Sequence, residues 1–107
     1  MMKVVIADDF SFTPGPRLIK EGDFSGELFR TTILAPKMRE AIEKGDQLTV
    51  VLDGTAGCGT SFLEESFAGL IRKDGINPSV LIQTLKVISV EEPWLVEEVW
   101  RYIKDAS

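Results

Sequence analysis

The sequence predicts an α/β domain whose mixed sheet of about four strands is packed by helices, and three observations support this. Short runs of β-branched and apolar residues, as at residues 48–53, are typical of buried strands. Longer segments repeat hydrophobic residues at helical spacing, and turns rich in glycine or proline separate the two kinds of segment. The 107 residues suffice for one core, so we expect a single domain over residues 1–107, with elements in the order β-β-α-β-α-β-α.

Residues 1–20 predict an irregular hairpin. The run of Val and Ile after Lys3 indicates a short strand over residues 2–7. Two prolines flank a glycine in residues 13–16, which suits a turn rather than a helix or a central strand. Residues 17–20 can then form a second short strand beside the first. This antiparallel edge is what makes the expected sheet mixed.

A first long helix is expected over residues 26–44. Its hydrophobic residues recur at helical spacing, Ser25 is a suitable N-cap, and Gly45 stands where helices commonly end. Pro36 lies well inside this segment, where it deletes one backbone hydrogen bond and should kink the helix. The alternative is two shorter helices that meet at Ala35.

A buried strand, a glycine-rich loop and a second helix are expected in residues 48–73. Three glycines in residues 54–59 cannot continue a strand or a helix, so the chain leaves the sheet there. Ser61 is the expected helix cap, and Glu64, three residues later, completes a capping box. This arrangement places a small polar patch at the carboxyl edge of the sheet, where ligands of open α/β sheets usually bind.

The remaining chain predicts one helical turn across residues 79–83, a last strand over residues 85–90 and a last helix with Pro93 in its first turn. The β-α-β-α-β part should be parallel, with right-handed crossovers. We expect Glu64 and Glu65 to lie on a solvated helix face. The expected core contains Val50, Leu52, Phe67, Leu70, Val87, Ile88 and Ile103.

Composition and charge exclude several classes of protein. Hydrophobic residues make up 44% of the chain and charged residues 27%, which is typical of a folded domain. The net charge of −5 disfavours duplex nucleic acid and anionic membranes as partners. No stretch approaches the ~20 apolar residues of a membrane span, and we expect no signal peptide. One cysteine excludes an internal disulfide and suits a reducing compartment, so we expect a cytoplasmic protein. We also expect no cofactor.

The candidate site is the loop of residues 54–59 with its two flanks. Its backbone N–H groups, with a helix N-terminus behind them, could hold a phosphate or a carboxylate. No lysine precedes Thr60 and Ser61, so the loop does not match a P-loop, and a tight turn remains the favoured interpretation. The position between a buried strand and a helix predicts φ > 0 at Gly57, Gly59 or both.

Four other residues at this edge each have a structural and a functional interpretation. Asp53 could bind a metal or act as a base, but an Asp-Gly pair at a strand end more often shapes the turn. Cys58 could have a lowered pKa near the helix start, although most lone cysteines are inert. Thr60 and Ser61 are either helix caps, which local chemistry favours, or exposed hydroxyls where an added phosphate is tolerated. We expect Ser61 to be reachable from solvent.

Residues 50–53, followed by a loop of small residues and by Thr60-Ser61 at a helix start, resemble the STAS domain of sulphate transporters and bacterial anti-sigma-factor antagonists. Three stretches are similar to the bacterial STAS-like domain of unknown function, at residues 13–17, 25–30 and 57–72. The resemblance covers most of the chain, and the last stretch is the most specific. It implies a STAS-like fold for the domain described above.

The resemblance also implies a function. Anti-sigma-factor antagonists are not enzymes; they bind a serine-kinase-like ATPase that phosphorylates a Ser or Thr at the start of the helix after the central strand, and this breaks the complex. By position, the acceptor here would be Ser61, or Thr60 next to it. The antagonists have Asp before these hydroxyls and Gly after them, whereas this chain has Gly59 and Phe62.

We therefore expect a non-enzymatic regulatory module that binds a protein, either a histidine-kinase-like ATPase or an anti-sigma factor. The residues expected to bind are Asp53, Gly54, Gly57, Gly59, Thr60 and Ser61. The alternative is a sensor of a small anion or nucleotide that uses the loop of residues 54–59 and the following helix N-terminus. An enzyme is the least favoured class, because the chain has no histidine and no evident carboxylate pair. No metal site is expected.

Overall fold

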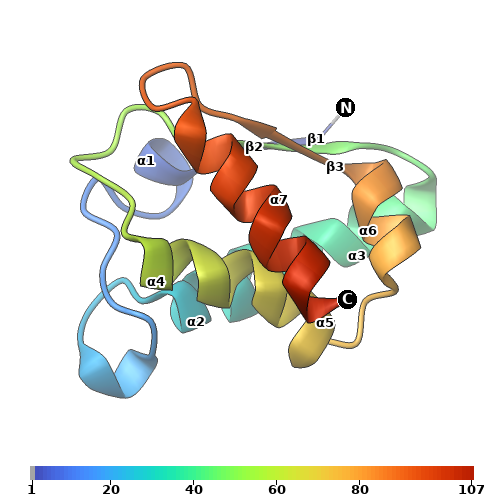
Figure 1. Cartoon of the computed structure of the whole chain (residues 1–107), viewed down its shortest axis with the longest axis horizontal. Coiled ribbons are helices and arrows are strands. Elements are labelled where there is room, and N and C mark those ends of the chain that lie inside the picture. The colour runs from blue at the N-terminus through green and yellow to red at the C-terminus, as the bar shows by residue number, and fades with distance from the viewer. Residues whose placement is uncertain (1) are drawn as a thin grey trace.

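The computed structural model describes residues 2–107, which form a parallel sheet of three strands with the long helices packed against one face (Figure 1). The strands lie across the sheet in chain order: β1 (Met2–Val5), β2 (Leu48–Val51) and β3 (Leu85–Ile88). Val4 pairs with Val50, and Val50 with Val87. These three valines are buried beneath the helices, where β-branched side chains pack well on a pleated surface.

The expected hairpin at the N-terminus is wrong, and so is the mixed sheet of four strands. Instead, the chain turns from β1 directly into the short helix α1 (Ile6–Asp9), where Asp9 Oδ2 accepts a hydrogen bond of 2.7 Å from Val5 N. Residues 17–20 form no strand, and they lead into the 3₁₀ turn η1 (Ile19–Glu21). Within residues 2–107 the sheet thus has three strands, all of them parallel.

The backbone of this early segment finds its partners in the first long helix instead of in the sheet. The carbonyl of Pro16 accepts from Gly26 N at 2.9 Å, and the carbonyl of Arg17 accepts from Glu27 N at 3.0 Å. These bonds satisfy two of the N–H groups that a helix start leaves without an intrahelical partner. Residues 16–17, which we call the brace segment, therefore stabilise the start of this helix. The pattern of side chains in the sequence did not indicate this role.

The first crossover is one continuous helix with a π-helical turn in its middle. It consists of α2 (Gly26–Phe29), the π-helical segment η2 (Arg30–Leu34) and α3 (Ala35–Lys44). Ser25 Oγ accepts from Leu28 N at 3.0 Å, and Gly45 ends the helix with φ +67°, so both predicted ends are confirmed.

The π-helical turn explains how this helix accommodates its proline. Pro36 is the second residue of α3, and just before it Ala35 N–H bonds to Arg30 O, five residues back. The wider turn lies directly before the residue that has no N–H to donate. The hydroxyls of Thr31 and Thr32 also donate to carbonyls four residues earlier, at 2.8 and 2.6 Å. The segment is therefore one helix and not two.

The second crossover has the same construction. It consists of α4 (Thr60–Leu63), the π-helical segment η3 (Glu64–Ala68) and α5 (Gly69–Arg72), which run as one helix, and then of α6 (Pro78–Thr84). The helical turn predicted after residue 78 is confirmed, with Asn77 Oδ1 accepting from Ser79 N at 2.9 Å. The last helix, α7 (Trp94–Ala106), crosses in front of the others in Figure 1.

The core lies between the sheet and the helices. Of the residues expected there, Val50, Leu52, Phe67, Leu70, Val87 and Ile103 belong to it. Ile88 does not, because it lies on the other face of the sheet, next to Val51. No helix within residues 2–107 is long and apolar enough to cross a membrane.

A buried ion network joins the two crossover helices. Arg30, which is 3% exposed, donates to Glu65 at 3.2 Å and to Asp74 at 2.8 Å, and Lys73 donates to Glu65 at 2.9 Å. The expectation that Glu65 is solvated is therefore wrong. Gly69 makes room for this contact, because a Cβ there would lie 2.6 Å from Arg30 Nε.

Candidate functional site

Two loops meet at the carboxyl edge of the sheet, and Asp53 joins them. Its carboxylate accepts from Val90 N at 2.8 Å and from Glu91 N at 2.7 Å. In return, Gly54 N donates to Glu91 Oε1 at 2.8 Å. Asp53 therefore fixes the second loop through the backbone N–H groups of Val90 and Glu91, whereas the turn interpretation had it shape the adjacent Asp-Gly turn. Within residues 2–107 no group of three or more His, Cys, Asp or Glu residues is arranged to hold a metal ion.

The glycine loop needs glycine at two of its three positions. Gly54 has φ +91° and Gly57 has φ +154°, which side chains disfavour. Gly59 has φ −68° and is the N-cap of α4. The prediction of a positive φ at one or both of Gly57 and Gly59 is thus confirmed, and the residue concerned is Gly57. Ala56 N donates to Phe12 O at 2.8 Å, which ties the loop to the chain after α1.

A hollow of about 210 Å³ opens between this loop and the start of α7. It is lined by Leu52, Thr55, Ala56, Gly57, Cys58, Ser89, Glu91, Glu92 and Leu95. The lining contains two glutamates and neither lysine nor arginine, and Glu91 already occupies the N–H of Gly54. These carboxylates would repel an anion, so the hollow does not favour the anion sensor that the loop alone suggested.

Cys58 lies against this hollow as a buried thiol. It is 9% exposed, and burial raises its pKa, with the nearby Glu92 carboxylate adding to the rise. Thr55 Oγ1 lies 3.5 Å from the sulfur and opposes the shift. Because the thiolate is the reactive form, a raised pKa leaves Cys58 a weak nucleophile at neutral pH. The inert interpretation is the one that this geometry favours.

Thr60 and Ser61 lie at the start of α4 as exposed side chains. The expected cap is wrong, because the helix begins at Thr60 with Gly59 as N-cap, and no side chain caps it. Ser61 is thus already inside the first turn. Its hydroxyl is exposed, as predicted, and neither it nor the Thr60 hydroxyl has a hydrogen-bond partner within residues 2–107.

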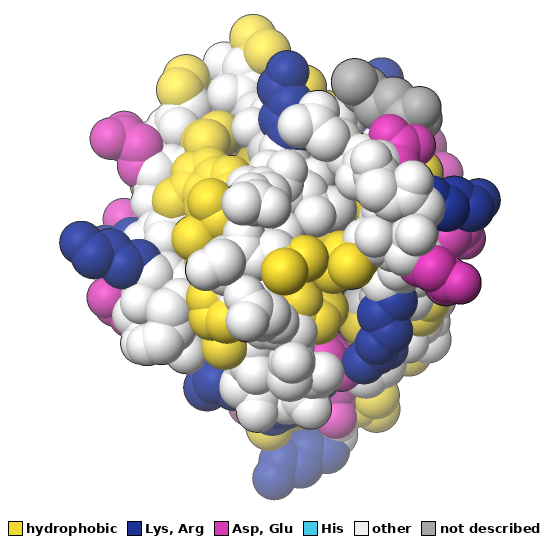
Figure 2. All heavy atoms as spheres, turned by 90° about the vertical axis from the view of Figure 1, so that its right-hand side faces the viewer, with side chains coloured by type: hydrophobic (Ala, Val, Ile, Leu, Met, Phe, Trp, Pro, Cys, Tyr) yellow, Lys and Arg dark blue, Asp and Glu magenta, His cyan; other side chains and the backbone are white. Residues whose placement is uncertain are grey.

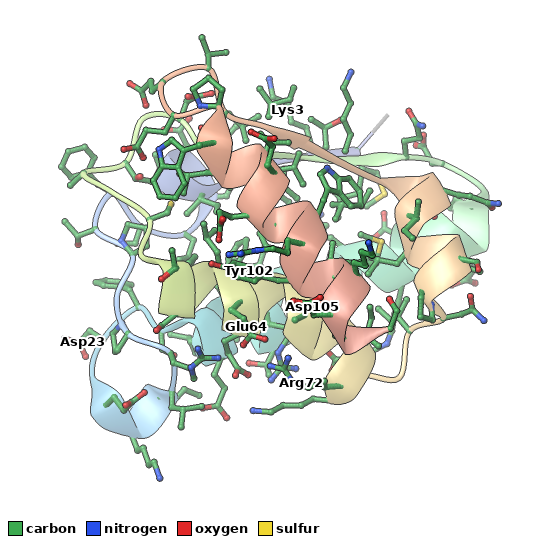
Figure 3. The ribbon with its side chains drawn as sticks, in the orientation of Figure 1. Lys3, Asp23, Glu64, Arg72, Tyr102 and Asp105 are labelled. Atoms are coloured by element: carbon green, nitrogen blue, oxygen red, sulfur yellow. The ribbon has the colours of Figure 1, made fainter. Side chains whose placement is uncertain are left out.

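Glu64 binds two arginines, and it is in no capping box because Gly59, not Ser61, is the N-cap of the helix. It accepts from Arg72 at 2.9 Å and from Arg17, which comes from the segment that braces the first helix. Figure 3 shows Glu64 and Arg72 near one another on the side of the helices that faces away from the sheet. Arg72 and then Arg17 hold the pKa of this carboxyl below its usual value. The sequence placed Glu64 on a solvated face, whereas it is partly buried.

Exposed apolar side chains surround the same edge, and sequence reasoning did not identify them as a group. Phe12 is 61% exposed, Val90 is 78% exposed and Trp94 is 51% exposed. Each belongs to a segment at this edge, because Phe12 O accepts from Ala56 N of the glycine loop, Asp53 binds the backbone N–H of Val90, and Trp94 starts α7. Exposed apolar groups gathered at one place often mark an interaction site. We call Phe12, Val90 and Trp94, with Glu91 and Glu92, the edge surface.

The opposite edge, at the amino ends of the strands, carries a second hollow of about 250 Å³. It is lined by Ala41, Ile42, Gly45, Asp46, Gln47, Val80, Gln83 and Thr84. Figure 2 looks onto this side of the molecule and shows small apolar patches separated by polar atoms, with charged side chains mainly towards the margins. Asp46 is the charged residue of this lining, and the N–H of Gln47 binds its carboxylate and lowers its pKa.

Comparison with known families agrees with this architecture. A family model described as the STAS-like domain of unknown function (DUF4325) matches residues 25–94, from the cap of the first helix to the start of the last one. Searches of curated proteins and of solved structures returned no match. The matched region contains the central strand, the glycine loop, Thr60 and Ser61. The chain belongs to the family of the STAS-like domain of unknown function.

Proposed function

We propose that this protein is a non-enzymatic regulatory module that binds another protein through the carboxyl edge of its sheet. By its resemblance to anti-sigma-factor antagonists, the partner is a histidine-kinase-like ATPase or an anti-sigma factor, and Ser61 is the residue that the kinase modifies, with Thr60 as the second acceptor. The observation that carries this proposal is the exposed and unpartnered Ser61 hydroxyl beside the glycine loop.

The start of the second crossover helix can accommodate a phosphate on Ser61. The first intrahelical hydrogen bond of this helix runs from Leu63 N to Gly59 O, so the N–H groups of residues 60–62 have no intrahelical acceptor. A phosphate adds about −1.5 to −2 charges at pH 7, and a helix N-terminus favours negative charge. The carboxylate of Glu64, three residues on, is already bound by Arg17 and Arg72. The fold should therefore survive the modification.

The edge surface supports binding rather than catalysis. Asp53 is bound by backbone N–H groups, and Cys58 is buried with a raised pKa, so neither is placed as a free base or an activated nucleophile. Exposed aromatic side chains next to carboxylates instead suit a partner with an apolar and basic contact surface. A charged group added at such a contact must be desolvated, which costs free energy unless the partner pairs with it.

The test compares Ser61→Asp with Ser61→Ala. A photo-crosslinking residue at Thr60, with a matched one at the exposed Lys37, first identifies the partner that contacts this edge in the source cell. Both Ser61 variants should fold, with unfolding free energies within about 0.5 kcal/mol of wild type, because Ser61 caps nothing.

Titration calorimetry with the purified partner then decides the proposal. The aspartate variant should bind about tenfold more weakly or worse, while the alanine variant binds as wild type does. Equal binding by both variants would reduce Ser61 to an ordinary surface residue. If only the Lys37 position crosslinks, the carboxyl edge is not the interface.

A further inference from the structure

Arg17 extends from the start of the first crossover helix to the surface of the second one. Its backbone carbonyl accepts from Glu27 N at 3.0 Å, and its guanidinium donates from Nη1 to Glu64. The first helix contacts the second one on the side of Glu65, because a Cβ at Gly26 would lie 3.2 Å from Glu65 Cβ. The Arg17 side chain therefore passes over the second helix from the side of Glu65 to Glu64.

Ser61 stands beside this side chain. An α-helix turns about 100° per residue, so Glu65 is about 40° from Ser61 in one direction around the helix, and Glu64 is about 60° from it in the other. Residues three and four apart are also neighbours on a helix surface, with Cβ atoms about 5–6 Å apart. The Ser61 hydroxyl, which is exposed and has no partner within residues 2–107, therefore lies next to the path of Arg17.

Arg17 can leave Glu64 without leaving that carboxylate unpaired. Arg72 donates to both oxygens of Glu64, from Nη1 to Oε2 and from Nη2 to Oε1, so these two side chains form a bidentate pair (Figure 3). Arg17 adds a single contact through Nη1, and the other donors of its guanidinium have no partner in the described part of the chain. Its side chain is 38% exposed. Arg17 thus has both spare donors and room to move.

We propose that Arg17 is the residue that binds a phosphate on Ser61, and that Glu64 then keeps Arg72 alone. The inference rests on the proposed function, in which the kinase supplies the phosphate. The bond from Ser61 Oγ to the γ-phosphorus of ATP forms, the bond from that phosphorus to ADP breaks, and the hydroxyl proton leaves to water. The planar guanidinium fits two phosphate oxygens at once, and a phosphate of about −1.5 to −2 charges attracts it more strongly than a carboxylate does.

Without Arg17, the same phosphate would meet an uncompensated repulsion. Glu64 is three residues from Ser61, and like charges that are neighbours on a helix surface destabilise it. The guanidinium of Arg17 lies close to both anions and offsets this repulsion. Phosphorylation therefore moves one arginine of the brace segment from Glu64 to the modified serine.

The modified protein can be prepared without any kinase, because Cys58 follows Gly57 and permits native chemical ligation. Residues 1–57 are expressed as a ¹⁵N-labelled thioester, and residues 58–107 are synthesised with serine or phosphoserine at position 61. The ³¹P signal of the refolded chain is then followed between about pH 4 and 8, around the usual second phosphate pKa of about 6.

The variants are Arg17→Gln and, as a control with the same loss of charge three residues away, Lys20→Gln. Lys20 is exposed and has no partner within residues 2–107. Arg17→Gln should raise the pKa of the phosphate by about 0.5 or more, because a paired cation favours the dianion. Lys20→Gln should change this pKa by about 0.2 or less, since water and salt screen a more distant charge.

A measurement on the wild-type chain tests the contact without any substitution. The side-chain ¹⁵Nε signal of Arg17 should shift on phosphorylation, while that of Arg39, which pairs with Asp74, should not. The inference is overturned if both variants raise the pKa of the phosphate equally, or if the Arg17 signal is the same in the modified and unmodified chains.

These measurements do not involve the partner, so they separate this inference from the proposed function. A chain whose phosphate is bound by Arg17 but which binds its partner unchanged would contradict the proposed function alone. A chain that loses its partner although Arg17 does not bind the phosphate would overturn this inference alone.

Discussion

Asp53 and Ser61 both lie at the carboxyl edge of the sheet, but their surroundings give them different roles. Asp53 accepts hydrogen bonds from two consecutive backbone N–H groups and so fixes a second loop against the first. Ser61 has an exposed hydroxyl without a partner in the described chain. Substitution of Asp53 would therefore disturb the shape of the whole edge. Substitution of Ser61 alters one exposed group, which makes it the better probe of function.

Gly57 and Gly59 provide a matched test of backbone conformation. A Cβ would meet nothing within 4 Å at either position, so a substitution clashes with no neighbour. The two positions differ in backbone conformation, because φ is +154° at Gly57 and −68° at Gly59. Gly57→Ala should lose about 1–3 kcal/mol of unfolding free energy from backbone strain. Gly59→Ser should unfold with a free energy a few tenths of a kcal/mol higher than wild type, because serine is the better N-cap. A change in unfolding free energy of about 0.5 kcal/mol or less counts as neutral.

Urea denaturation of both variants measures this difference. If Gly57→Ala is as stable as wild type, the loop can adopt another conformation and glycine is not required there. If Gly59→Ser is the less stable of the two, the N-cap geometry at the start of α4 is not the one described.

At the scale of elements, the sequence patterns correctly predicted those helices and strands whose ends and spacing are determined by local residues. The first long helix has its N-cap at Ser25 and its left-handed end at Gly45, because cap chemistry is local. The hairpin was wrong because Pro16 and Arg17 give their carbonyls to the first helix, a partner that the sequence does not display. The π-helical turns were missed for a similar reason, since hydrophobic spacing does not distinguish them from an α-helix.

The same distinction applies to the candidate site. The strand, the loop and the helix that follows were predicted, and so was the exposure of Ser61, because glycine and hydroxyl residues carry local signals, but the N-cap is Gly59 and not Ser61. The pairing of Glu64 with Arg17 and of Glu65 with Arg30 joins residues far apart in the chain. No pattern along the sequence indicates such contacts. The expectation of solvated glutamates therefore failed where tertiary contacts decide the outcome.

Phe67 tests how much the second crossover helix depends on the core. It is 0% exposed and lies in η3, the segment that packs against α7. Phe67→Ala should cost about 3–5 kcal/mol of unfolding free energy, as for other buried aromatic residues. Phe12→Ala is the matched control, because the same atoms are removed from a side chain that is 61% exposed, and it should change stability by about 0.5 kcal/mol at most. Equal losses in chemical denaturation would show that Phe67 is not a core residue.

At the scale of the whole molecule, charged and apolar side chains are distributed unevenly over the surface. The edge surface, at the carboxyl ends of the strands, combines exposed aromatic side chains with Glu91 and Glu92. On the face of the sheet away from the helices (Figure 1), the exposed Lys3 and Lys86 lie on the two outer strands. The acidic groups of the edge surface and these two lysines therefore lie on different sides of the sheet.

Glu64 holds separate parts of the molecule together, and its titration links stability to pH. It binds Arg72 at the end of the same helix and Arg17 in the brace segment. Arg72 first, and then Arg17, lower its pKa in the folded protein. A lowered folded-state pKa contributes stability above the unfolded value of about 4.3, and this contribution is lost as the pH falls through the folded-state pKa. Acid should therefore weaken this connection.

The variant Glu64→Gln should be about 1 kcal/mol less stable than wild type at pH 7, a modest figure because the ion pairs are partly exposed and screened by water. The difference should shrink as the pH is lowered below about 4, since wild type then loses the same charge. Salt should reduce the difference in unfolding free energy at pH 7.

Glu97→Gln is the control, because Glu97 is exposed and has no partner within residues 2–107. This variant should match wild type in stability at every pH. Urea denaturation across this pH range measures both variants. If the difference between Glu64→Gln and wild type does not change with pH, a lost packing contact accounts for it, because an ionised carboxylate bound to Arg17 and Arg72 must titrate.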